Sequence, residues 1–181
     1  MKRLVLGVSG KARHGKDTAA DFLKKTFEEK GFLVVKLPLA TYIKQYAMLL
    51  GWDGLESTKP RELLQTLGTE VIKQKMNKKL FHAERIAEDI DIMSEVVDKT
   101  TIFIIPDVRF KSEINYLKAY FQSEFKTLRV VRHNFDNGLT GEQQVHLSEI
   151  DLDDYNEFDY CAWNDGTIED FYTEIKETMG L

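Results

Sequence analysis

Short apolar runs alternate along the chain with longer stretches in which apolar side chains recur every three or four positions. Four of these runs are rich in Val, Ile and Leu and have the length of a strand, which is typical of parallel strands buried on both faces. The pattern predicts five strands, at residues 3–8, 32–37, 101–105, 127–132 and 159–163.

Helical periodicity fills the intervals between these runs. Apolar residues from Ala19 to Phe27 form one stripe of a helix, and Lys30 with the following glycine forms a typical C-terminal stop. A further helix is predicted to start at residues 57–60, with Pro60 in its first turn, and to run to Gly68. Others are predicted at 77–97, at 113–121 with Ser112 as the N-cap, and at 168–179 after a turn. Strands that alternate with helices predict an α/β fold with a parallel, about five-stranded sheet and right-handed crossovers.

The length of 181 residues suits one domain, 1–181, with its core at about residues 1–40 and 100–181. Two segments are longer than the connections of a minimal sheet require. Residues 41–99 insert several helices, and residues 133–156 are polar and acidic. Because long insertions on a compact sheet are commonly lids or binding loops, we expect a helical binding insertion and a lid.

The composition is that of a folded globular protein, with 43% hydrophobic and 30% charged residues and only 3 Pro. The formal net charge of -5 has the wrong sign for a protein that coats polymeric nucleic acid, although a small anion needs only a local cluster of cations. No apolar run approaches the roughly 20 residues that span a membrane, and the N-terminal apolar stretch is too short for a secretory signal. We therefore expect a cytoplasmic protein with no membrane partner.

The cysteine and histidine residues show no metal-binding pattern. A single cysteine, Cys161, excludes an internal disulfide, and we expect it to pack as a small buried side chain. The four histidines share no ligand spacing and are interpreted as loop or surface residues: His14, His82, His133 and His146.

A phosphate-binding motif, G-x-x-x-x-G-K, runs from Gly10 to Lys16, directly after the first strand and at the start of a helix. In that context the backbone N–H groups converge on phosphate oxygens, and Lys16 reaches the β and γ phosphates. The alternative is a glycine-rich turn. The motif predicts these nucleotide-binding residues: Gly10, Lys11, Arg13, His14, Gly15, Lys16, Asp17 and Thr18.

Asp17 stands where such loops usually have Ser or Thr, and the hydroxyl comes one residue later, on Thr18. A bare carboxylate beside a triphosphate would repel it, so we infer that Mg²⁺ or its water shell lies between them. Thr18 would then bind a phosphate further back along the nucleotide. The alternative is that Asp17 only stabilises the first turn of its helix.

A second polar site follows the third strand, where the sequence reads PDVR. Asp107 would lie at the carboxyl edge of the sheet and hold Mg²⁺, partly through water, and Arg109 would grip a substrate phosphate. The alternative is a charged surface turn.

Further cations come from Arg61 in the first insertion and from Arg132 at the end of the fourth strand. Phosphoryl transfer depends on positioning and on neutralising charge, so arginines on insertions are expected parts of such a site. Alternatively, Arg61 belongs to a solvated helix face, and Arg129 or Arg132 is a charge at a strand edge. The predicted catalytic residues are therefore Lys16, Asp17, Asp107, Arg109 and Arg132. The acidic run at 149–159 is interpreted as a solvated loop, because it lacks the turn glycine of a calcium loop.

Five blocks of sequence together resemble the deoxynucleoside monophosphate kinases of tailed phages and prophages. They are GKARHGKDTAADFL, KPRELLQTLGTE, PDVRFKSEINYL, HLSE and NDGTIEDF, and they occur in the family's order between Gly10 and Phe171. An Asp after the lysine of the phosphate loop is typical of that family.

The resemblance implies a three-layer P-loop NTPase fold with a helical NMP-binding insertion and a lid, ATP as the donor, Mg²⁺, and a deoxynucleoside monophosphate as the acceptor, for supply of phage DNA precursors. It implies that Arg61 and Gln65 bind the acceptor, that Arg109 meets the acceptor phosphate, and that Arg132 begins the lid. It also places Asn164, Asp165 and Gly166 near the base of the donor. Where the family has Pro-Asn after DVRF, this chain has Lys111 and Ser112, and Lys111 would add a cation to the acceptor site.

Other functions fit the same motifs, because a fold does not fix the acceptor. The chain could be another small-molecule P-loop kinase, of the dephospho-coenzyme A or phosphomevalonate type, or a non-catalytic nucleotide-binding switch. The accepted bases and the preference between ribose and deoxyribose are left open, and a homodimer is compatible with the sequence.

Overall fold

A parallel sheet forms the centre of the protein. The computed structural model describes residues 3–181, and in this part of the chain five parallel strands pair in the order β2-β3-β1-β4-β5. The strands are β1 (Arg3–Ser9), β2 (Leu33–Lys36), β3 (Thr101–Val108), β4 (Phe125–Val131) and β5 (Tyr160–Trp163). All five predicted strands are confirmed. β3 runs three residues beyond its predicted end at Ile105, so Asp107 lies inside the strand.

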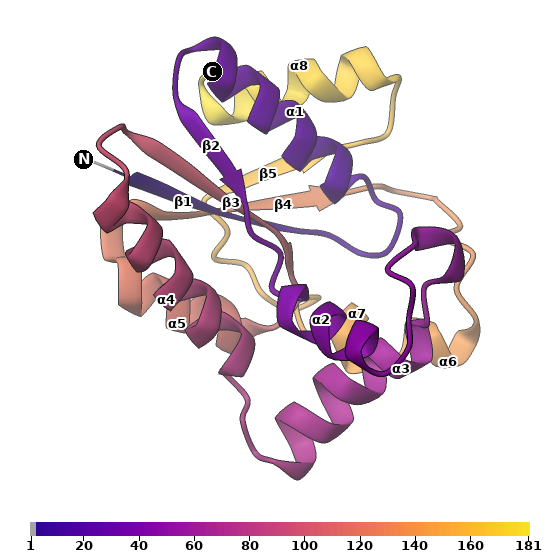
Figure 1. Ribbon diagram of the computed structural model, residues 1–181. Helices are drawn as coiled ribbons and strands as arrows, with labels where there is room; N and C mark the ends of the chain where they lie inside the picture. The colour runs from indigo at the N-terminus through magenta and orange to yellow at the C-terminus, as the bar shows by residue number, and fades with distance from the viewer. Residues whose placement is uncertain (1–2) are drawn as a thin grey trace.

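Helices cover both faces of the sheet and make three layers, as predicted (Figure 1). α1 (Lys16–Glu29) and α8 (Ile168–Met179) pack on one face, where Leu6 and Val8 are buried. α4 (Phe81–Val96) and α5 (Lys111–Phe121) pack on the other face, against Val5 and Phe103. Neighbouring strand residues point to opposite faces, which explains why the strands read as nearly continuous apolar runs.

The segment predicted as a binding insertion, residues 41–99, divides into two parts. α2 (Thr41–Leu49), η1 (Glu56–Thr58), α3 (Arg61–Gln65) and the π-helix η2 (Thr66–Lys75) extend away from the sheet. α4 instead belongs to the core, because its Ala83, Ile86 and Ala87 are fully buried in the cluster that contains Phe103.

Several predicted helix boundaries are wrong. The helix predicted at 77–97 begins only at Phe81. The helix that begins at Arg61 does not stop at Gly68, because it continues as a π-helix to Lys75. α5 begins at Lys111, so Ser112 lies inside the helix and is not its N-cap. The side chain of Glu113 caps this end instead, by accepting hydrogen bonds from the backbone N–H groups of Arg109 and Phe110.

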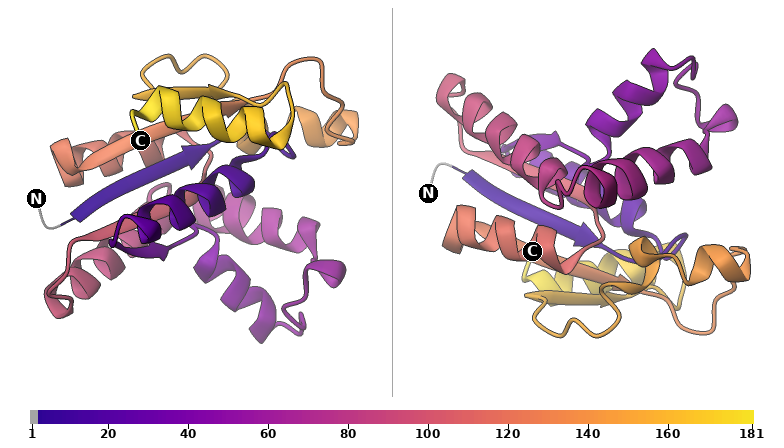
Figure 2. Two further views of the ribbon diagram at one scale, coloured as in Figure 1. Left: turned by 90° about the horizontal axis from the view of Figure 1, so that it is seen from above. Right: turned by 90° about the horizontal axis from the view of Figure 1, so that it is seen from below.

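Two short helices of the predicted lid, α6 (Gly141–Gln144) and α7 (Leu147–Ile150), lie with the insertion beyond the carboxyl ends of the strands (Figure 2). η3 (Gln122–Glu124) directly precedes β4, at the amino end of that strand. β1 lies between β3 and β4, so the loop that follows it is placed where the strand order reverses, which is the usual position of a ligand in open α/β sheets. Every helix within residues 3–181 is too short or too polar to cross a lipid bilayer.

Candidate active site

The loop between β1 and α1 is held in a tight turn by its two glycines. Gly15 has φ +102°, and a Cβ there would lie 2.5 Å from Nδ2 of Asn164, so a side chain is excluded by conformation and by contact. A Cβ on Gly10 would lie 2.9 Å from the carbonyl oxygen of Val130. Asn164 also donates a hydrogen bond from Nδ2 to the carbonyl oxygen of His14, at 2.9 Å. Asn164 therefore fixes the loop from the end of β5.

Lys16 and Asp17 open α1 with contrasting environments. The Lys16 side chain is only 9% exposed, and its Nζ lies 3.5 Å from Oδ2 of Asp17. The Asp17 side chain is 74% exposed. An ammonium held by burial beside an accessible carboxylate is suited to a ligand that carries both phosphates and a metal ion.

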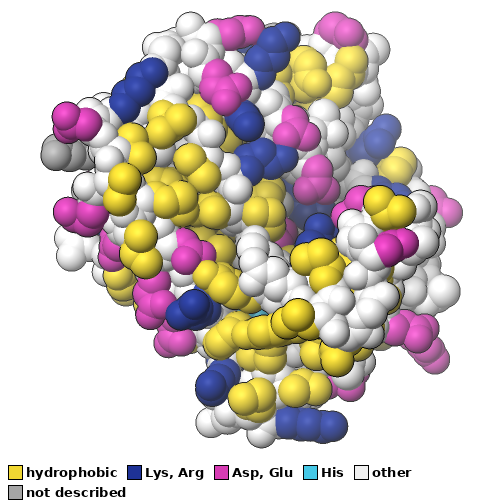
Figure 3. Space-filling view, viewed as in Figure 1, with side chains coloured by type: hydrophobic (Ala, Val, Ile, Leu, Met, Phe, Trp, Pro, Cys, Tyr) yellow, Lys and Arg dark blue, Asp and Glu magenta, His cyan; other side chains and the backbone are white. Residues whose placement is uncertain are grey.

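A cleft of about 490 Å³ joins the phosphate loop to the insertion, the end of β3 and the lid. Figure 3 shows the hollow on this face of the molecule, with Lys and Arg side chains along its walls. This volume lies within the range of small-molecule sites. The predicted site residues that line it are Arg13, Lys16, Asp17, Arg61, Gln65, Asp107 and Arg109.

The end of β3 is tied to the start of α2 through Asp107. Its two carboxylate oxygens accept hydrogen bonds from the backbone N–H groups of Leu39 at 2.7 Å and Ala40 at 3.0 Å. Burial raises the pKa of Asp107, and these two amides oppose the rise. The carboxylate thus positions the entrance of the insertion as well as facing the cleft.

Arg109 is joined to the phosphate loop by a lid residue. Its Nη1 donates to Oε1 of Glu149 at 2.6 Å, and Oε2 of Glu149 accepts from the backbone N–H of Ala12 at 2.9 Å. The Glu149 side chain is only 9% exposed. One carboxylate therefore bridges a phosphate-loop amide and the predicted acceptor arginine.

The acidic segment that contains Glu149 is not a freely solvated loop, so that interpretation is wrong. Oδ2 of Asp153 accepts from Lys11 at 2.7 Å, and Oδ2 of Asp151 accepts from the backbone N–H of Lys111 at 2.7 Å. Nζ of Lys111 pairs with Oδ1 of Asp154 at 2.6 Å. Lys111 is outside the lining of the cleft and is held against the lid.

A buried ion pair links the insertion to α5. Nζ of Lys73, in η2, lies 2.5 Å from Oε1 of Glu113, and the two side chains are 9% and 4% exposed. The ammonium also lies 3.3 Å from the ring centroid of Phe110. Burial lowers the pKa of Lys73, and the Glu113 carboxylate opposes this. Glu113 thus fixes both the insertion and the backbone of Arg109.

For His82 the prediction of a loop or surface histidine is wrong, because the residue lies in α4 and is buried. Only 3% of it is accessible, and its ring lines the cleft. Burial, with a smaller effect from the nearby charge of Lys73, lowers its pKa to about 4. The imidazole is therefore neutral at neutral pH.

The residues predicted to lie near the donor base gather at the ends of β4 and β5. Asp165 accepts hydrogen bonds from the backbone N–H of His133 at 2.6 Å and pairs with its Nδ1 at 2.7 Å, which lowers the pKa of Asp165. The guanidinium of Arg132 lies over the ring of Phe135, 4.1 Å from its centroid. This group, with Gly166 next to Asp165, is outside the lining of the cleft.

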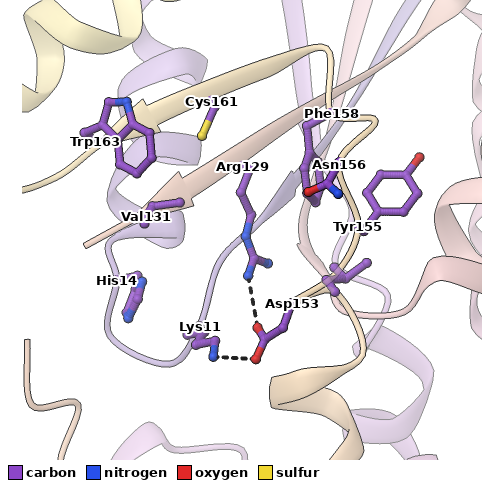
Figure 4. Close-up of a pocket in the computed structure, with 11 residues that line it drawn as sticks. Lys11, His14, Arg129, Val131, Asp153, Tyr155, Asn156, Phe158, Cys161 and Trp163 are labelled. Carbon is purple, nitrogen blue, oxygen red and sulfur yellow. Dashed lines mark hydrogen bonds and ion pairs between the residues drawn. The ribbon is translucent and has the colours of Figure 1, made fainter. Parts of the chain in front are cut away.

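A second cavity, of about 460 Å³, lies behind the phosphate loop and shares no lining residue with the cleft (Figure 4). Lys11 and His14 line it from the loop, and Arg129 points into it toward Asp153, with 3.8 Å between the charged groups. Cys161 also lines this cavity and is half-buried, so the expectation of a buried cysteine is wrong. Burial lowers the pKa of Arg129 and raises that of Cys161.

A sequence model of the deoxynucleotide monophosphate kinase family matches residues 55–175, which is more than half of the chain. The chain belongs to this family. The matched region holds the insertion from residue 55 onward, the end of β3, the lid and the loop after β5, whereas α2 lies before it. The phosphate loop lies before it and is identified by its own motif.

One curated protein resembles this chain in sequence, and two solved kinases resemble it in fold. A protein of Acanthamoeba polyphaga mimivirus, provisionally named a deoxynucleotide monophosphate kinase, is 24% identical over 191 residues, which cover 95% of this chain and 94% of that protein. The Mycobacterium tuberculosis APS kinase in complex with AMPPNP and APS has a TM-score of 0.58 at 10% identity, over 99% of both chains. A gluconokinase from Sinorhizobium meliloti has a TM-score of 0.53 at 10% identity, over 98% of this chain and 91% of that one.

The protein is accordingly a P-loop kinase, an ATP-dependent phosphotransferase. The roles of its individual residues remain predictions. Sequence reasoning missed four ionisable residues of the cleft whose side chains are nearly buried: Lys73, His82, Glu113 and Glu149. A signal for Glu113 was present, because a glutamate three residues into a helix often accepts from the N-cap amide. No local signal pairs Lys73 with Glu113 or Glu149 with Arg109, since each pair is 40 residues apart.

Proposed function

We propose that this kinase transfers the γ-phosphate of ATP to a deoxynucleoside monophosphate, giving the diphosphate and ADP, to supply DNA precursors for a phage or prophage. The observation that carries the proposal is the shared cleft of Lys16, Arg61 and Arg109. Lys16 belongs to a phosphate loop, whereas the two arginines come from separate segments. Two sets of cations in one cleft are what a donor and a phosphorylated acceptor require.

In the proposed mechanism, the loop amides at 11–18 and Lys16 bind the phosphates of ATP, and Asn164, Asp165 and Gly166 border its base. Arg61 and Gln65 bind the acceptor, and Arg109 turns from Glu149 toward the acceptor phosphate. An oxygen of that phosphate forms a bond to the γ-phosphorus, and the bond from this phosphorus to the β–γ bridging oxygen breaks, which releases ADP. Lys16 and the arginines, with Arg132 at the start of the lid, neutralise the charge that develops.

The donor set fits Mg²⁺. Within residues 3–181 no cluster of three or more His, Cys, Asp or Glu side chains could hold a metal, but two carboxylates, of Asp17 and Asp107, line the same cleft as Lys16. Mg²⁺ commonly binds through one or two carboxylates together with substrate phosphates and water. We propose that Asp17 and Asp107 hold the ion, partly through water, and that it supplies charge neutralisation at the phosphates.

Asp17→Ala is expected to raise the free Mg²⁺ concentration for half-maximal activity by about 10-fold or more, because one carboxylate no longer orders the metal and its water shell. Initial rates over a Mg²⁺ series at fixed ATP measure this. Asp21→Ala, an exposed carboxylate on the same helix but outside the cleft, is the matched control. An unchanged Mg²⁺ dependence in the Asp17 variant would remove Asp17 from the metal site.

The function is tested by a panel of acceptors, with ADP formation coupled to detection, on the wild type and on Arg109→Ala. The panel holds deoxynucleoside and ribonucleoside monophosphates, dephospho-coenzyme A and phosphomevalonate. We expect turnover with deoxynucleoside monophosphates, and a fall of about 10²- to 10³-fold in kcat/KM for the acceptor in Arg109→Ala, with ATP affinity retained. Arg85→Ala, on α4 and outside the cleft, should behave like the wild type.

Two results would reject the proposed function. Turnover with dephospho-coenzyme A or phosphomevalonate alone would make the protein a kinase of another small molecule. Tight binding of ATP with no acceptor-dependent turnover would indicate a nucleotide-binding switch.

A further inference from the structure

His82 is a polar side chain that the fold buries without pairing. It is the second residue of α4, 3% exposed, and neither Nδ1 nor Nε2 has a hydrogen-bond partner among the residues at 3–181. The backbone at Gly68 approaches the ring without a hydrogen bond of acceptable geometry. Buried polar groups in proteins are nearly always hydrogen-bonded, so an unpaired one calls for an explanation.

The place of His82 in the fold gives that explanation. Its ring lines the cleft, together with Gln65, Gly68 and Thr69 of the insertion. A Cβ on Gly68 would lie 3.9 Å from Nε2 of His82 and 2.7 Å from Cδ1 of Ile43. Because glycine stands there, residue 68 places no side chain of its own between the insertion and the ring nitrogen.

The chemistry of the ring selects the part of a ligand that it suits. Burial and the charge of Lys73 keep the imidazole neutral, so it offers one N–H donor and one nitrogen acceptor, without a charge. A phosphate would be better met by a cation, and Arg61 and Arg109 supply those in the same cleft. An uncharged donor or acceptor suits the edge of a nucleobase.

We propose that His82 hydrogen-bonds the base of the acceptor nucleotide and so sets which deoxynucleoside monophosphates this kinase prefers. The proposal rests on the proposed function, because it takes the acceptor to be a nucleotide. Either tautomer is open to a neutral imidazole, so Nε2 can donate or accept. His82 therefore makes the affinity for the acceptor depend on its base, and does not restrict the kinase to a single base.

The test measures kcat and KM for dAMP, dGMP, dCMP and dTMP with the wild type and with His82→Phe, which keeps a ring of similar shape and removes both nitrogens. We expect kcat/KM for the best acceptor to fall by about 10- to 100-fold, and that for the poorest acceptor by less than about 3-fold, because only a base that pairs with His82 loses a hydrogen bond. The loss should lie in the KM of the acceptor, with kcat and the KM of ATP nearly unchanged.

Two further variants separate base recognition from folding. Ile86→Val, one turn further along α4 and fully buried but outside the cleft, lowers stability without touching the site, so it should leave the ratios among the four acceptors unchanged. His82→Gln retains a donor and an acceptor, and should reorder the four acceptors if His82→Phe does not fold. Thermal unfolding of each variant shows which proteins are folded.

The outcomes distinguish the two proposals. If the wild type phosphorylates no deoxynucleoside monophosphate, the proposed function fails, and the role of His82 fails with it. If the wild type is active and folded His82 variants change kcat/KM by the same factor for all four acceptors, or not at all, then His82 is structural or is satisfied by water. In that case the proposed function stands and base recognition by His82 is overturned.

Discussion

Replacing Lys16 by Met is expected to lower kcat/KM for phosphoryl transfer by about 10³-fold or more, because the variant loses a preorganised cation at the transferring group. The Lys16 side chain is 9% exposed, so the fold has already desolvated and oriented the ammonium before a nucleotide arrives. Its ion pair with Asp17, at 3.5 Å, is long enough to leave N–H donors for phosphate oxygens. Met keeps the aliphatic stem, and so preserves the packing at the start of α1.

Steady-state kinetics with ATP and a deoxynucleoside monophosphate measure this loss, and binding of an ATP analogue shows how much of it is affinity. Lys24→Met is the matched control, since Lys24 lies on the same helix, 41% exposed and paired with Glu28. It should match the wild type within about 2-fold, as expected of a surface pair. If Lys16→Met retained more than a tenth of the wild-type activity, the phosphate loop would not be the donor site.

Local patterns in the sequence were sufficient to predict the sheet and the phosphate loop. Most of β3 is buried on both faces, so most of its residues are apolar, and that requirement is visible in the run TIFII. The phosphate loop is recognised from a local motif that directly follows an apolar strand. The contacts that require Gly10 and Gly15 are not local, because they are made with Val130 and Asn164.

The parts that sequence reasoning missed are set by tertiary contacts. The π-helix of η2 adds a residue to the helical period, and Gly68 resembles a helix stop although its role is a close approach to Ile43. His82 has apolar neighbours, Phe81 and Ala83, so its burial could be suspected from the sequence. The lack of hydrogen-bond partners for its ring could not be inferred from the sequence, because it depends on which residues of the insertion pack against the ring.

The acidic run at 149–159 is a second case in which contacts between distant residues decide the structure. As a sequence it resembles a solvated loop, whereas in the structure Glu149 and Asp153 pair with groups of the phosphate loop and the end of β3. Six acids close together would repel one another unless cations faced them. Those cations come from distant parts of the chain, so the pattern alone could not place them.

The buried pair of Lys73 and Glu113 should have the largest effect on stability. Glu113→Gln leaves the Lys73 ammonium without its counter-ion at 2.5 Å, and Lys73→Met leaves a buried carboxylate that only two backbone amides compensate. Each change is expected to lower the free energy of unfolding by about 3–5 kcal/mol, because an uncompensated charge in a buried site is far costlier than the pair. Urea denaturation measures both losses.

The double variant Lys73→Met, Glu113→Gln distinguishes this mechanism from simple loss of packing. It contains no unpaired buried charge, so its loss should be smaller than the sum of the two single losses by at least about 1 kcal/mol. Additive losses, or single losses below about 1 kcal/mol, would mean that the pair does not stabilise the fold. Glu113 also holds the backbone N–H of Arg109. Glu113→Gln should therefore raise the KM of the acceptor more than Lys73→Met does, since only the former weakens the contact that positions the arginine.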